Sequence, residues 1–421
     1  MALVDIRQLM AGVLTFSMLV MLMNMVKTDY FDAPLTEFSV GDFHERIPTQ
    51  RETEHLIQSD WPRNRSTDAL KPCWTRPPHR KLDQEDRGLG NLRGYIIFSL
   101  TGGHEHHLSQ VSNAIVVARR LGATLVMPDV IEKRTGDRRK FGEFYDVHKF
   151  ITSIEGIVKI SVVQPLEIST RPLTLVRVPN GVTEDYIHSK VEPLYKKKRN
   201  LKIVTDFSTS PVTKVESNNI TSISCLAMFE ALQLKTELQK AIHSMVEKLR
   251  SSGKNSNDVY IAVDLEDEIL GKKGCHGSRD DGSKSCYSAH DIGQFLKKIR
   301  IEREANIYLT LNGWHDSVNL LTEIYPNVHT KESLIPSEKV VPFLSPETSV
   351  YKKIIDYYIC SWSDIYVPAK FDHFHASVVG KRIAIGEKIV LEPAELNSEN
   401  GTAYISPYLL RKSHYAYSCF C

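Results

Sequence analysis

Two stretches of the sequence alternate short apolar runs with helical patterns, and this rhythm constrains the fold more than any other feature. The first stretch opens with the apolar run 95–98, passes through a glycine-containing loop, and continues with apolar residues at helical spacing between 111 and 118. Gly122 is typical of the end of such a helix, and 123–127 predicts a second strand, which Pro128 stops. A strand, a helix and a strand in this order predict a parallel sheet covered by helices.

The same alternation returns in the second half of the chain, after an amphipathic helical pattern at about 236–250 and a Ser, Gly and Asn-rich break. The apolar run 259–265 predicts the first strand of this half. It is followed by predicted helices and strands in βα order: helix 289–299, strand 306–310, helix 317–324, helix 350–360 and strand 364–368. The fold class is therefore predicted to be α/β, with two Rossmann-like lobes, 91–252 and 253–421, facing a central cleft.

A cleft of this kind has a predictable lining. Open parallel sheets bind ligands beyond the carboxyl ends of their strands. The loops after Phe98, Leu265 and Thr310 and the segment around Asp364 are therefore expected to line one cleft between the lobes.

The composition excludes several other classes of protein. A chain of 421 residues that is 42% hydrophobic and 25% charged is too ordinary for a disordered, collagen-like or disulfide-knot protein. Its formal net charge of +2 leaves no broad basic surface, so no nucleic-acid partner is expected. No segment repeats at a fixed period, and only the extreme N-terminus is continuously apolar, which excludes solenoids and multispan transporters.

The N-terminus predicts a membrane anchor. Residues 9–26 carry no charge, and as a helix they extend about 27 Å, enough for one crossing of a thin bilayer. No small-residue cleavage site follows the run, which favours a retained signal anchor over a cleaved signal peptide. Arg7 precedes the span and Asp29, Asp32 and Glu37 follow it, so the tail 1–8 is expected in the cytosol and the body in a secretory lumen. Residues 27–90, rich in Pro and charged residues, predict an extended luminal stem.

Glycosylation signals and cysteines agree with a luminal body. Asn64, Asn219 and Asn400 each begin a permitted N-glycosylation triplet. Seven cysteines in an oxidising lumen are expected to form disulfides, and the odd count leaves at least one that is unpaired or pairs between chains. The best predicted pair is Cys275 with Cys286, which flank a Gly, Ser and Asp-rich loop. No CxxC occurs, so a four-cysteine zinc site has little support.

The loop after the first strand carries the first candidate site. Gly102 and Gly103 let backbone N–H groups approach an anionic or sugar ligand, or they only form a tight turn. Glu105 is either the base that accepts a proton from an acceptor hydroxyl, and hence the candidate catalytic residue, or a solvated acid at the start of a helix. The histidines at 104, 106 and 107 are expected to be exposed and solvated, and no metal is predicted.

Two further segments carry polar residues next to predicted strands. The run Asp264-Leu265-Glu266-Asp267-Glu268 places four carboxylates after a core strand, where they bind a ligand or a metal or pair with the basic loop that contains Lys272 and Lys273. Ser363 and Asp364 precede a strand, where they bind a ribose, a base or a phosphate, or only mark the end of a helix and the start of the strand.

Beyond these single sites, several motifs together resemble the plant O-fucosyltransferase-like glycosyltransferases, over nearly everything after Gly94. Within that family the chain looks closest to the mannan synthesis-related proteins, because the anchor 5–14 and the tail 413–421 are also similar. The motifs that carry the resemblance are ARRLGATLVMPD (118–129), FYDVHKFI (144–151), YIAVDL (260–265), TKE (330–332) and SDIYVP (363–368).

The resemblance implies a fold, a location and a reaction. It implies a type II single-pass protein of the Golgi membrane with a GT-B-like body. It also implies a GDP-sugar donor, GDP-fucose or GDP-mannose, without a required metal or other cofactor, and a polysaccharide or glycan acceptor in cell-wall mannan synthesis. By this resemblance Gly102, Gly103, Asp264, Leu265, Glu266, Glu268, Ser363 and Asp364 would bind the donor.

The sequence also departs from the family at two motifs. The glycine loop usually continues with Leu-Asn-Gln, whereas here it continues with His-Glu-His. The second motif usually carries an arginine that stabilises the departing diphosphate, and here Glu266 replaces it. Lys272, Lys273, Lys381 or Arg382 would have to supply the missing positive charge. The alternative is a non-catalytic relative that scaffolds or stabilises a mannan synthase.

Overall fold

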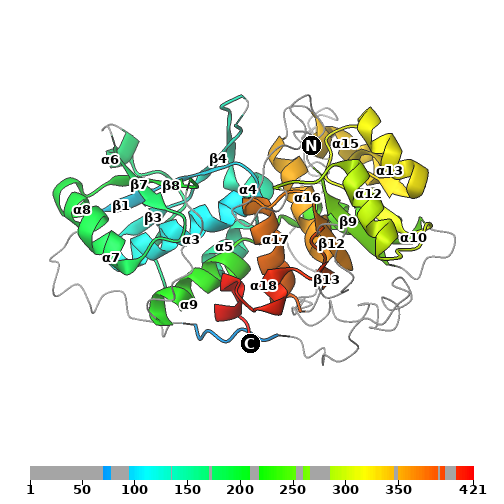
Figure 1. Ribbon diagram of the computed structural model, residues 1–421. Coiled ribbons are helices and arrows are strands. Elements are labelled where there is room, and N and C mark those ends of the chain that lie inside the picture. Colours follow the sequence, from blue (N-terminus) through cyan, green and yellow to red (C-terminus); the bar gives the residue numbers. More distant parts are fainter. Residues whose placement is uncertain are drawn as a thin grey trace, which may run out of the picture. The chain divides into compact units, whose positions relative to one another are not determined.

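A computed structural model describes ten ranges of the chain (Figure 1): 70–76, 94–133, 135–169, 173–208, 218–252, 259–265, 285–345, 349–386, 389–393 and 404–421. All of them belong to the second of two compact units, Pro48–Cys421. Within these ranges no helix is both long enough and apolar enough to cross a membrane. The predicted tail 1–8 and anchor 9–26 lie outside the described residues, and the predicted stem enters them only at 70–76.

The first half of the chain forms a parallel five-stranded sheet in the order β6-β3-β1-β8-β7. Its strands are β1 (Tyr95–Ile97), β3 (Thr124–Val126), β6 (Ile160–Ser161), β7 (Thr174–Pro179) and β8 (Leu201–Asp206), and every neighbouring pair is parallel. The predicted strands at 95–98 and 123–127 are confirmed as β1 and β3. A smaller sheet beside it contains β2 (Ser99–Thr101), β4 (Asp129–Ile131) and β5 (Arg138–Lys140).

Helix α3 (His104–Leu121) connects β2 to β3. Gly122 ends it in the left-handed conformation with φ 63°, and its backbone N–H caps the last carbonyls, as the sequence predicts. All but three of the helix's 18 residues are buried, because it packs against the strands on one side and against α9 (Asn218–Leu226), α16 (Ser349–Trp362) and α17 (His373–Ala384) on others.

The second half forms another parallel sheet, in the order β11-β10-β9-β12-β13. Its strands are β9 (Tyr260–Asp264), β10 (Asn306–Leu309), β11 (Val328–His329), β12 (Ile365–Pro368) and β13 (Ile389–Val390). Every residue of β9 is buried, as expected for a central strand covered on both faces. The chain leaves β9 towards β10 on one side and later returns to β12 on the other, and a reversal of this kind creates the crevice where such folds bind ligands.

The remaining helices cover these sheets. Helix α12 (Ala289–Lys298) begins at a capping box formed by Ser288 and Asp291. The α-helices not yet named are α4 (Phe141–Phe144), α5 (Val147–Ser153), α6 (Leu166–Ser169), α7 (Glu184–Tyr186), α8 (Glu192–Lys198), α10 (Thr236–Ser251), α13 (Asn319–Ile324), α14 (Lys331–Leu334), α15 (Val340–Leu344) and α18 (Pro407–Leu410). Short π- and 3-10 turns are η2 (Ile187–Val191), η3 (Ala227–Ala231), η4 (Asp316–Val318), η5 (Ser337–Lys339) and η7 (Tyr415–Ser418).

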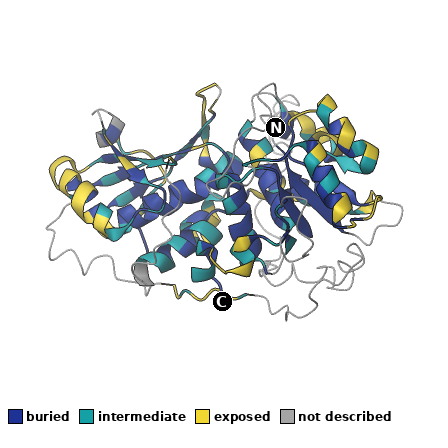
Figure 2. Ribbon diagram, viewed as in Figure 1, coloured by how far each residue is buried: buried dark blue, intermediate teal, exposed yellow. Residues whose placement is uncertain are grey.

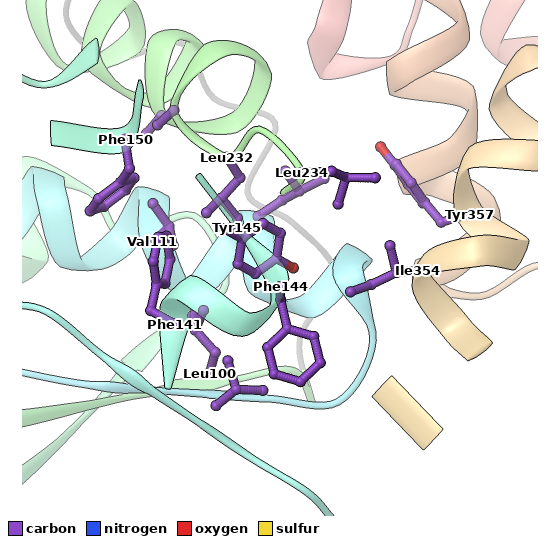
Figure 3. Close-up of a cluster of buried hydrophobic side chains, with 14 of the residues drawn as sticks. Leu100, Val111, Phe141, Phe144, Tyr145, Phe150, Leu232, Leu234, Ile354 and Tyr357 are labelled. Atoms are coloured by element: carbon purple, nitrogen blue, oxygen red, sulfur yellow. The ribbon is translucent and has the colours of Figure 1, made fainter. Parts of the chain in front are cut away.

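The core does not divide as simply as the sheets do. The strands of the first sheet end at Asp206, and those of the second begin at Tyr260. However, the largest buried apolar cluster joins the first sheet and α3 to residues of α16 and α17, such as Ile354 and Tyr357 (Figures 2 and 3). A second cluster surrounds the apolar side chains of β9, β10 and β12. Helices α16 and α17 therefore connect the two halves by packing and not only by sequence.

The C-terminal tail is tied to the first half of the chain by a disulfide. Cys419 is bonded to Cys225 of α9, across a sequence separation of 194 residues. Cys286 is also disulfide-bonded, while Cys275, its predicted partner, lies outside the described residues. Spacing along the sequence favours short loops, which is why the pairing of Cys225 with Cys419 was not predicted.

Candidate functional site

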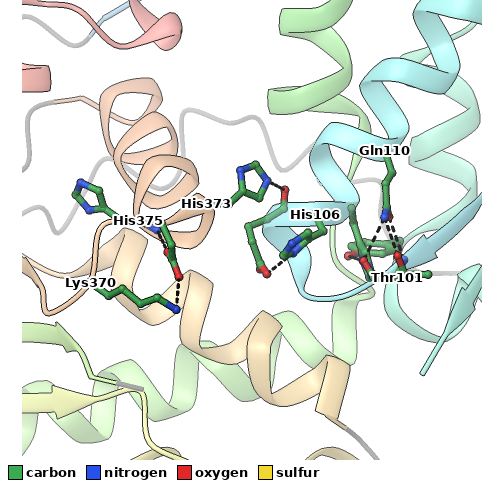
Figure 4. Close-up of polar contacts among 10 residues, drawn as sticks. Thr101, His106, Gln110, Lys370, His373 and His375 are labelled. Atoms are coloured by element: carbon green, nitrogen blue, oxygen red, sulfur yellow. Dashed lines mark hydrogen bonds and ion pairs between the residues drawn. The ribbon is translucent and has the colours of Figure 1, made fainter. Parts of the chain in front are cut away.

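The glycine loop between β2 and α3 encloses side chains of its own helix. A Cβ atom at Gly103 would lie 2.3 Å from Oε2 of Glu105, and one at Gly102, where φ is +86°, would lie 3.0 Å from the ring of His106. Gln110 fixes the start of this loop (Figure 4). Its side-chain amide accepts from the backbone N–H of Thr101 and donates to the Thr101 hydroxyl. The glycines make room for a carboxylate and an imidazole of the chain itself, in the space where the sequence suggested a ligand.

Glu105 is buried and ionised. Its side chain is 1% exposed, and its Oε1 lies 2.6 Å from Nδ1 of His106. Burial acts to raise the pKa of this carboxyl, but the hydrogen bond and charge of His106, the charge of Lys353 and the backbone N–H of Glu105 lower it to about 2. A carboxylate with this pKa must receive the hydrogen bond, so Nδ1 of His106 donates. The expectation of a solvated acid at the helix start is wrong, and the base role stays a prediction.

His106 keeps part of its ring accessible. Its side chain is 30% exposed, and its ring centroid lies 4.5 Å from that of Phe207 and 5.0 Å from that of His373. His373 donates from Nε2 to the backbone carbonyl of Glu105 over 3.0 Å, and burial lowers the pKa of its imidazole (Figure 4). We call His106, Phe207 and His373 the ring cluster.

The ring cluster lies where the topology predicts a ligand site. His106 is in the first turn of α3, Phe207 directly follows β8, and His373 opens α17 shortly after β12. All three positions follow the carboxyl end of a strand that has a parallel neighbour: β2 of the smaller sheet, β8 of the first five-stranded sheet and β12 of the second. Sequence reasoning found the α3 position but missed Phe207 and His373, because nothing in their local sequence marks them as partners of the glycine loop.

The other two histidines of the loop have a structural role. His104 and His107 are buried, and their Nδ1 atoms lie 3.0 Å and 2.6 Å from the hydroxyl of Tyr145. Burial lowers the pKa of both imidazoles, that of His107 to about 3, so both are neutral. The prediction that they are exposed is wrong. In the described part of the chain no group of three or more His, Cys, Asp or Glu side chains is arranged to hold a metal ion.

Asp264 ties together the carboxyl ends of three strands. It is buried at the end of β9, where its Oδ1 accepts from the hydroxyl of Thr310 over 3.1 Å and its Oδ2 from that of Tyr366 over 3.5 Å. Leu265 is fully buried in the second apolar cluster. These contacts shape the edge of the sheet from inside. Glu266, Glu268, Lys272 and Lys273 lie outside the described residues.

A buried lysine fixes the adjacent loop after β10. Lys331 forms an ion pair of 3.0 Å with Asp356 and donates to the carbonyls of Thr310 and Leu311. The hydroxyl of Tyr308 donates to the other oxygen of Asp356 over 2.6 Å. In the sequence, Lys331 stood out only as part of the family motif TKE (330–332), without a predicted role. It organises the backbone beside Asp264, at the ligand edge of the second sheet.

Ser363, Asp364 and Arg382 lie at the other edge of that sheet. Ser363 and Asp364 precede the amino end of β12, and the strands of a parallel sheet all begin at the same edge. Arg382 is fully buried and donates to the carbonyls of Ser363, Asp364 and Ile389. Asp364 also pairs with Arg250 over 3.0 Å. The expectation that this segment lines the cleft, and that Arg382 swings towards a diphosphate, is therefore wrong.

Two other lysines of this half differ in position. Lys381 lies two turns into α17, where burial lowers its pKa, and it has no ion-pair partner among the residues that the structure describes. Lys370 follows the carboxyl end of β12 and forms an ion pair of 3.4 Å with Asp372, the N-cap of α17 (Figure 4). Lys370 is thus the described lysine next to the predicted ligand edge, although its sequence context did not single it out.

The glycosylation predictions have not been tested. Asn219 lies in α9, and Asn64 and Asn400 lie outside the described residues.

Comparison with known proteins identifies the family. The chain is 41% identical to Protein MANNAN SYNTHESIS-RELATED 2 of Arabidopsis thaliana over 99% of its own length and 100% of that protein. It is 39% identical to Protein MANNAN SYNTHESIS-RELATED of Trigonella foenum-graecum over 99% of each chain. A crystal structure of POFUT1 in complex with GDP aligns with 72% of this chain and 99% of that chain, at 12% identity and a TM-score of 0.43. The family model described as GDP-fucose protein O-fucosyltransferase matches residues 95–385, which confirms the resemblance predicted from the sequence, and the chain belongs to this family.

Proposed function

We propose that this protein is a glycosyltransferase that takes a sugar from GDP-fucose or GDP-mannose and transfers it to a glycan acceptor in the synthesis of cell-wall mannan. The family description supports a GDP-sugar, and the names of the full-length relatives support mannan synthesis. The observation that carries the proposal is the meeting of His106 with His373. It brings the first turn of α3, which follows β2 in the first half of the chain, next to the segment that follows β12 in the second half, as a GT-B-like enzyme with one substrate on each lobe requires.

The donor belongs on the second lobe in this proposal. The carboxylate of Glu105 occupies the N-terminal turn of α3, and its negative charge would repel a diphosphate there. On the second lobe, Lys370 lies beside the crevice between β9 and β12. The loop fixed by Lys331 exposes Trp314, a flat side chain suited to a planar ring, at the end of β10.

We also propose that the protein is anchored in the Golgi membrane by residues 9–26, with a luminal and N-glycosylated body. The uncharged N-terminal run and the charges around it motivate this location. The disulfide between Cys225 and Cys419 supports it, because such bonds persist in oxidising compartments.

A second candidate function has its own motivating observation. Glu266 stands where the family usually has the arginine that stabilises the leaving diphosphate. An acid there opposes a departing anion, so a non-catalytic protein that stabilises a mannan synthase remains the alternative.

Titration of the full-length protein with GDP, GDP-fucose and GDP-mannose, followed by transfer assays on mannan oligosaccharides, tests the proposal. ADP serves as the matched control ligand. We expect GDP and one GDP-sugar to bind, ADP to bind more weakly, and sugar to appear on the oligosaccharide. Absence of both GDP binding and donor turnover would remove the enzyme function. Co-purification with a mannan synthase without GDP binding would support the alternative.

A further inference from the structure

We propose that His106, and not Glu105, accepts the proton of the acceptor hydroxyl. Glu105 is then a positioning residue: it orients the imidazole by a hydrogen bond and stabilises the imidazolium that forms. The inference rests on the proposed function, because it assigns a role within sugar transfer.

The geometry separates the two side chains by accessibility. Glu105 is 1% exposed, with Oε1 on His106 and Oε2 against Gly103, so its oxygens are enclosed by its own loop. His106 is 30% exposed and uses only Nδ1 for the carboxylate. We place the acceptor hydroxyl at the remaining nitrogen, Nε2, of this partly exposed ring. An acceptor hydroxyl can therefore meet the imidazole but not the carboxylate.

The tautomer follows from the charge of Glu105. An ionised carboxylate can only accept, so Nδ1 of His106 carries a proton whether the ring is charged or neutral, and in the neutral form that acts as the base Nε2 carries a lone pair. As the acceptor oxygen attacks C1 of the sugar, its proton moves to Nε2. The bond between C1 and the phosphate oxygen breaks at the same time, and GDP leaves with that electron pair. The imidazolium that forms is stabilised by the adjacent carboxylate.

The surrounding groups favour this division of roles. On α17, His373 donates its Nε2 proton to the Glu105 carbonyl and is neutral, and on α3 His104 and His107 are buried and neutral. Lys353 of α16 acts on Glu105 through its charge, and Phe207 after β8 is uncharged. Among the described histidines of this loop and of the ring cluster, His106 is thus the one that pairs with a carboxylate and keeps part of its ring exposed.

The test compares variants of the full-length protein. His106→Gln keeps an N–H for Glu105 and removes the proton acceptor, so we expect kcat to fall about 100-fold or more with GDP affinity unchanged. His106→Asn is made beside it, so that a folding failure of one variant does not decide the result. His188→Gln is the matched control, because His188 pairs with Glu192 over 2.8 Å at an exposed site and is not part of the ring cluster. We expect its kcat to be unchanged.

Glu105→Gln supplies the readout that a purely structural role would not move. Loss of the negative charge removes the stabilisation of the imidazolium, so we expect the acid limb of the pH profile of kcat/KM to shift to lower pH, together with a lower maximum. Wild-type protein without any transfer would overturn the proposed function. Active wild-type protein with normal kcat in both His106 variants, or an unshifted acid limb in Glu105→Gln, would overturn this inference alone.

A second inference has an independent basis in the tail. We infer that Cys73 and Cys421 form a disulfide that ties the segment 70–76 to the C-terminus. Pro72 and Phe420 form an antiparallel bridge, in which Lys71 exchanges both backbone hydrogen bonds with Cys421 and the N–H of Cys73 donates to the carbonyl of Cys419. Both thiols are exposed and unbonded, and the register of the bridge puts Cys73 opposite Cys419 with Cys421 as its diagonal neighbour on the same face.

A disulfide between Cys73 and Cys421 would link the predicted stem covalently to the folded body. The segment 70–76 lies between the predicted anchor and the first sheet, and Cys419 is already bonded to Cys225. Cross-linking Cys73 to Cys421 would make the tail a covalent junction between the stem and α9. Two thiols transfer their two electrons to a disulfide-bearing oxidant, such as an oxidoreductase of the secretory pathway, which leaves as a dithiol. Desolvation and the neighbouring Cys421 raise the pKa of Cys73 to about 11.

Peptide mapping of the full-length protein, secreted through an oxidising compartment and alkylated before unfolding, tests this pairing. We expect a non-reduced peptide that links Cys73 to Cys421, and its loss in Cys421→Ser. The buried Cys360 is the internal control, because its thiol should be alkylated only after unfolding. Alkylation of Cys73 and Cys421 as thiols, or a link from Cys73 to another cysteine, would overturn the inference.

Discussion

Two buried charge clusters in this protein look alike in composition and differ in position. One, at the start of α3, joins Glu105 to His106 and touches His373. The other, at the start of β12, joins Arg382 to Ser363 and Asp364. The first lies beyond the carboxyl ends of parallel strands and leaves an imidazole partly accessible. The second lies at the opposite edge of its sheet and is closed to solvent.

The difference teaches how to interpret a buried charge. Both clusters satisfy the rule that a buried charge needs partners. In the cluster around Arg382 the partners are backbone carbonyls of helix and strand ends, so the cluster joins elements. In the cluster around Glu105 the partner is a side chain with a second, unused nitrogen, so the buried charge can act on something outside the protein. A buried charge can contribute to a binding or catalytic site only where its hydrogen-bond partner is accessible from outside the protein. Otherwise it has a structural role.

The largest expected effect on stability comes from disrupting the cluster around Arg382. Arg382→Met removes the donors for Ser363, Asp364 and Ile389 and leaves their carbonyls without these partners. We expect the free energy of unfolding to fall by about 4 kcal/mol, as measured by denaturant titration. GDP affinity of the remaining folded protein should be unchanged. A loss of GDP affinity without a loss of stability would mean that Arg382 belongs to a binding site after all.

A smaller effect is expected from the acid pair, and it depends on pH. The folded-state pKa of Glu105 is lowered from 4.5 to about 2, so its ionised form contributes about 3 kcal/mol of stability above pH 4.5 at most. Because this pKa is depressed, the contribution is lost as pH falls from about 4.5 through about 2. Unfolding of wild type and Glu105→Gln, measured across this range, should show the difference in stability shrinking towards acid. A difference that does not change with pH would contradict the ionised pair.

The sequence predicted the fold better than the site, for a physical reason. Strands and helices follow from local periodicity, and β1, β3, β9, β10, β12, α10, α12 and α16 were expected within a few residues of their observed bounds, whereas α17 was not predicted. The helices α16 and α17 were not expected to complete the first core, because that packing depends on contacts between distant segments. The pairing of Cys225 with Cys419 was missed for the same cause.

The site was predicted where it depended on one loop and missed where it depended on several. Gly102, Gly103 and Glu105 were recognised because they are adjacent in sequence. Their use was not, since only the structure shows that the glycines accommodate the carboxylate itself. Ser363 and Asp364 were assigned to the cleft because they adjoin a strand, but adjacency does not say at which end of the strand a residue lies.

Glycine substitutions test whether the first cluster needs its room. In Gly103→Ala the new Cβ would lie 2.3 Å from the Glu105 carboxylate, so we expect about 2 kcal/mol less stability and a displaced His106. Gly136→Ala is the matched control, because Gly136 has a φ of +76° with open space around it. It should cost about 1 kcal/mol from backbone strain alone. Thermal unfolding compares the two, and equal stability of the two variants with normal sugar transfer by Gly103→Ala would contradict the crowded loop.

The smallest effect on stability is expected from the lysines, where the contrast between the two edges of the second sheet becomes a contrast in binding. Lys381 is half-buried without an ion pair among the described residues, and burial lowers its pKa, so Lys381→Met should change stability by about 0.5 kcal/mol or less, in the direction of a gain.

Lys370 lies beside the ligand edge, and Lys370→Met should weaken GDP binding by about tenfold, the loss of one charge-assisted contact. Calorimetric titration with GDP compares the two variants, with Lys381→Met as the control for loss of a positive charge from this half of the chain. If Lys381→Met instead lost GDP affinity and Lys370→Met kept it, the diphosphate would lie deeper along α17 than the carboxyl ends of the strands. A position at the accessible edge of the sheet would then no longer distinguish a binding residue from a structural one.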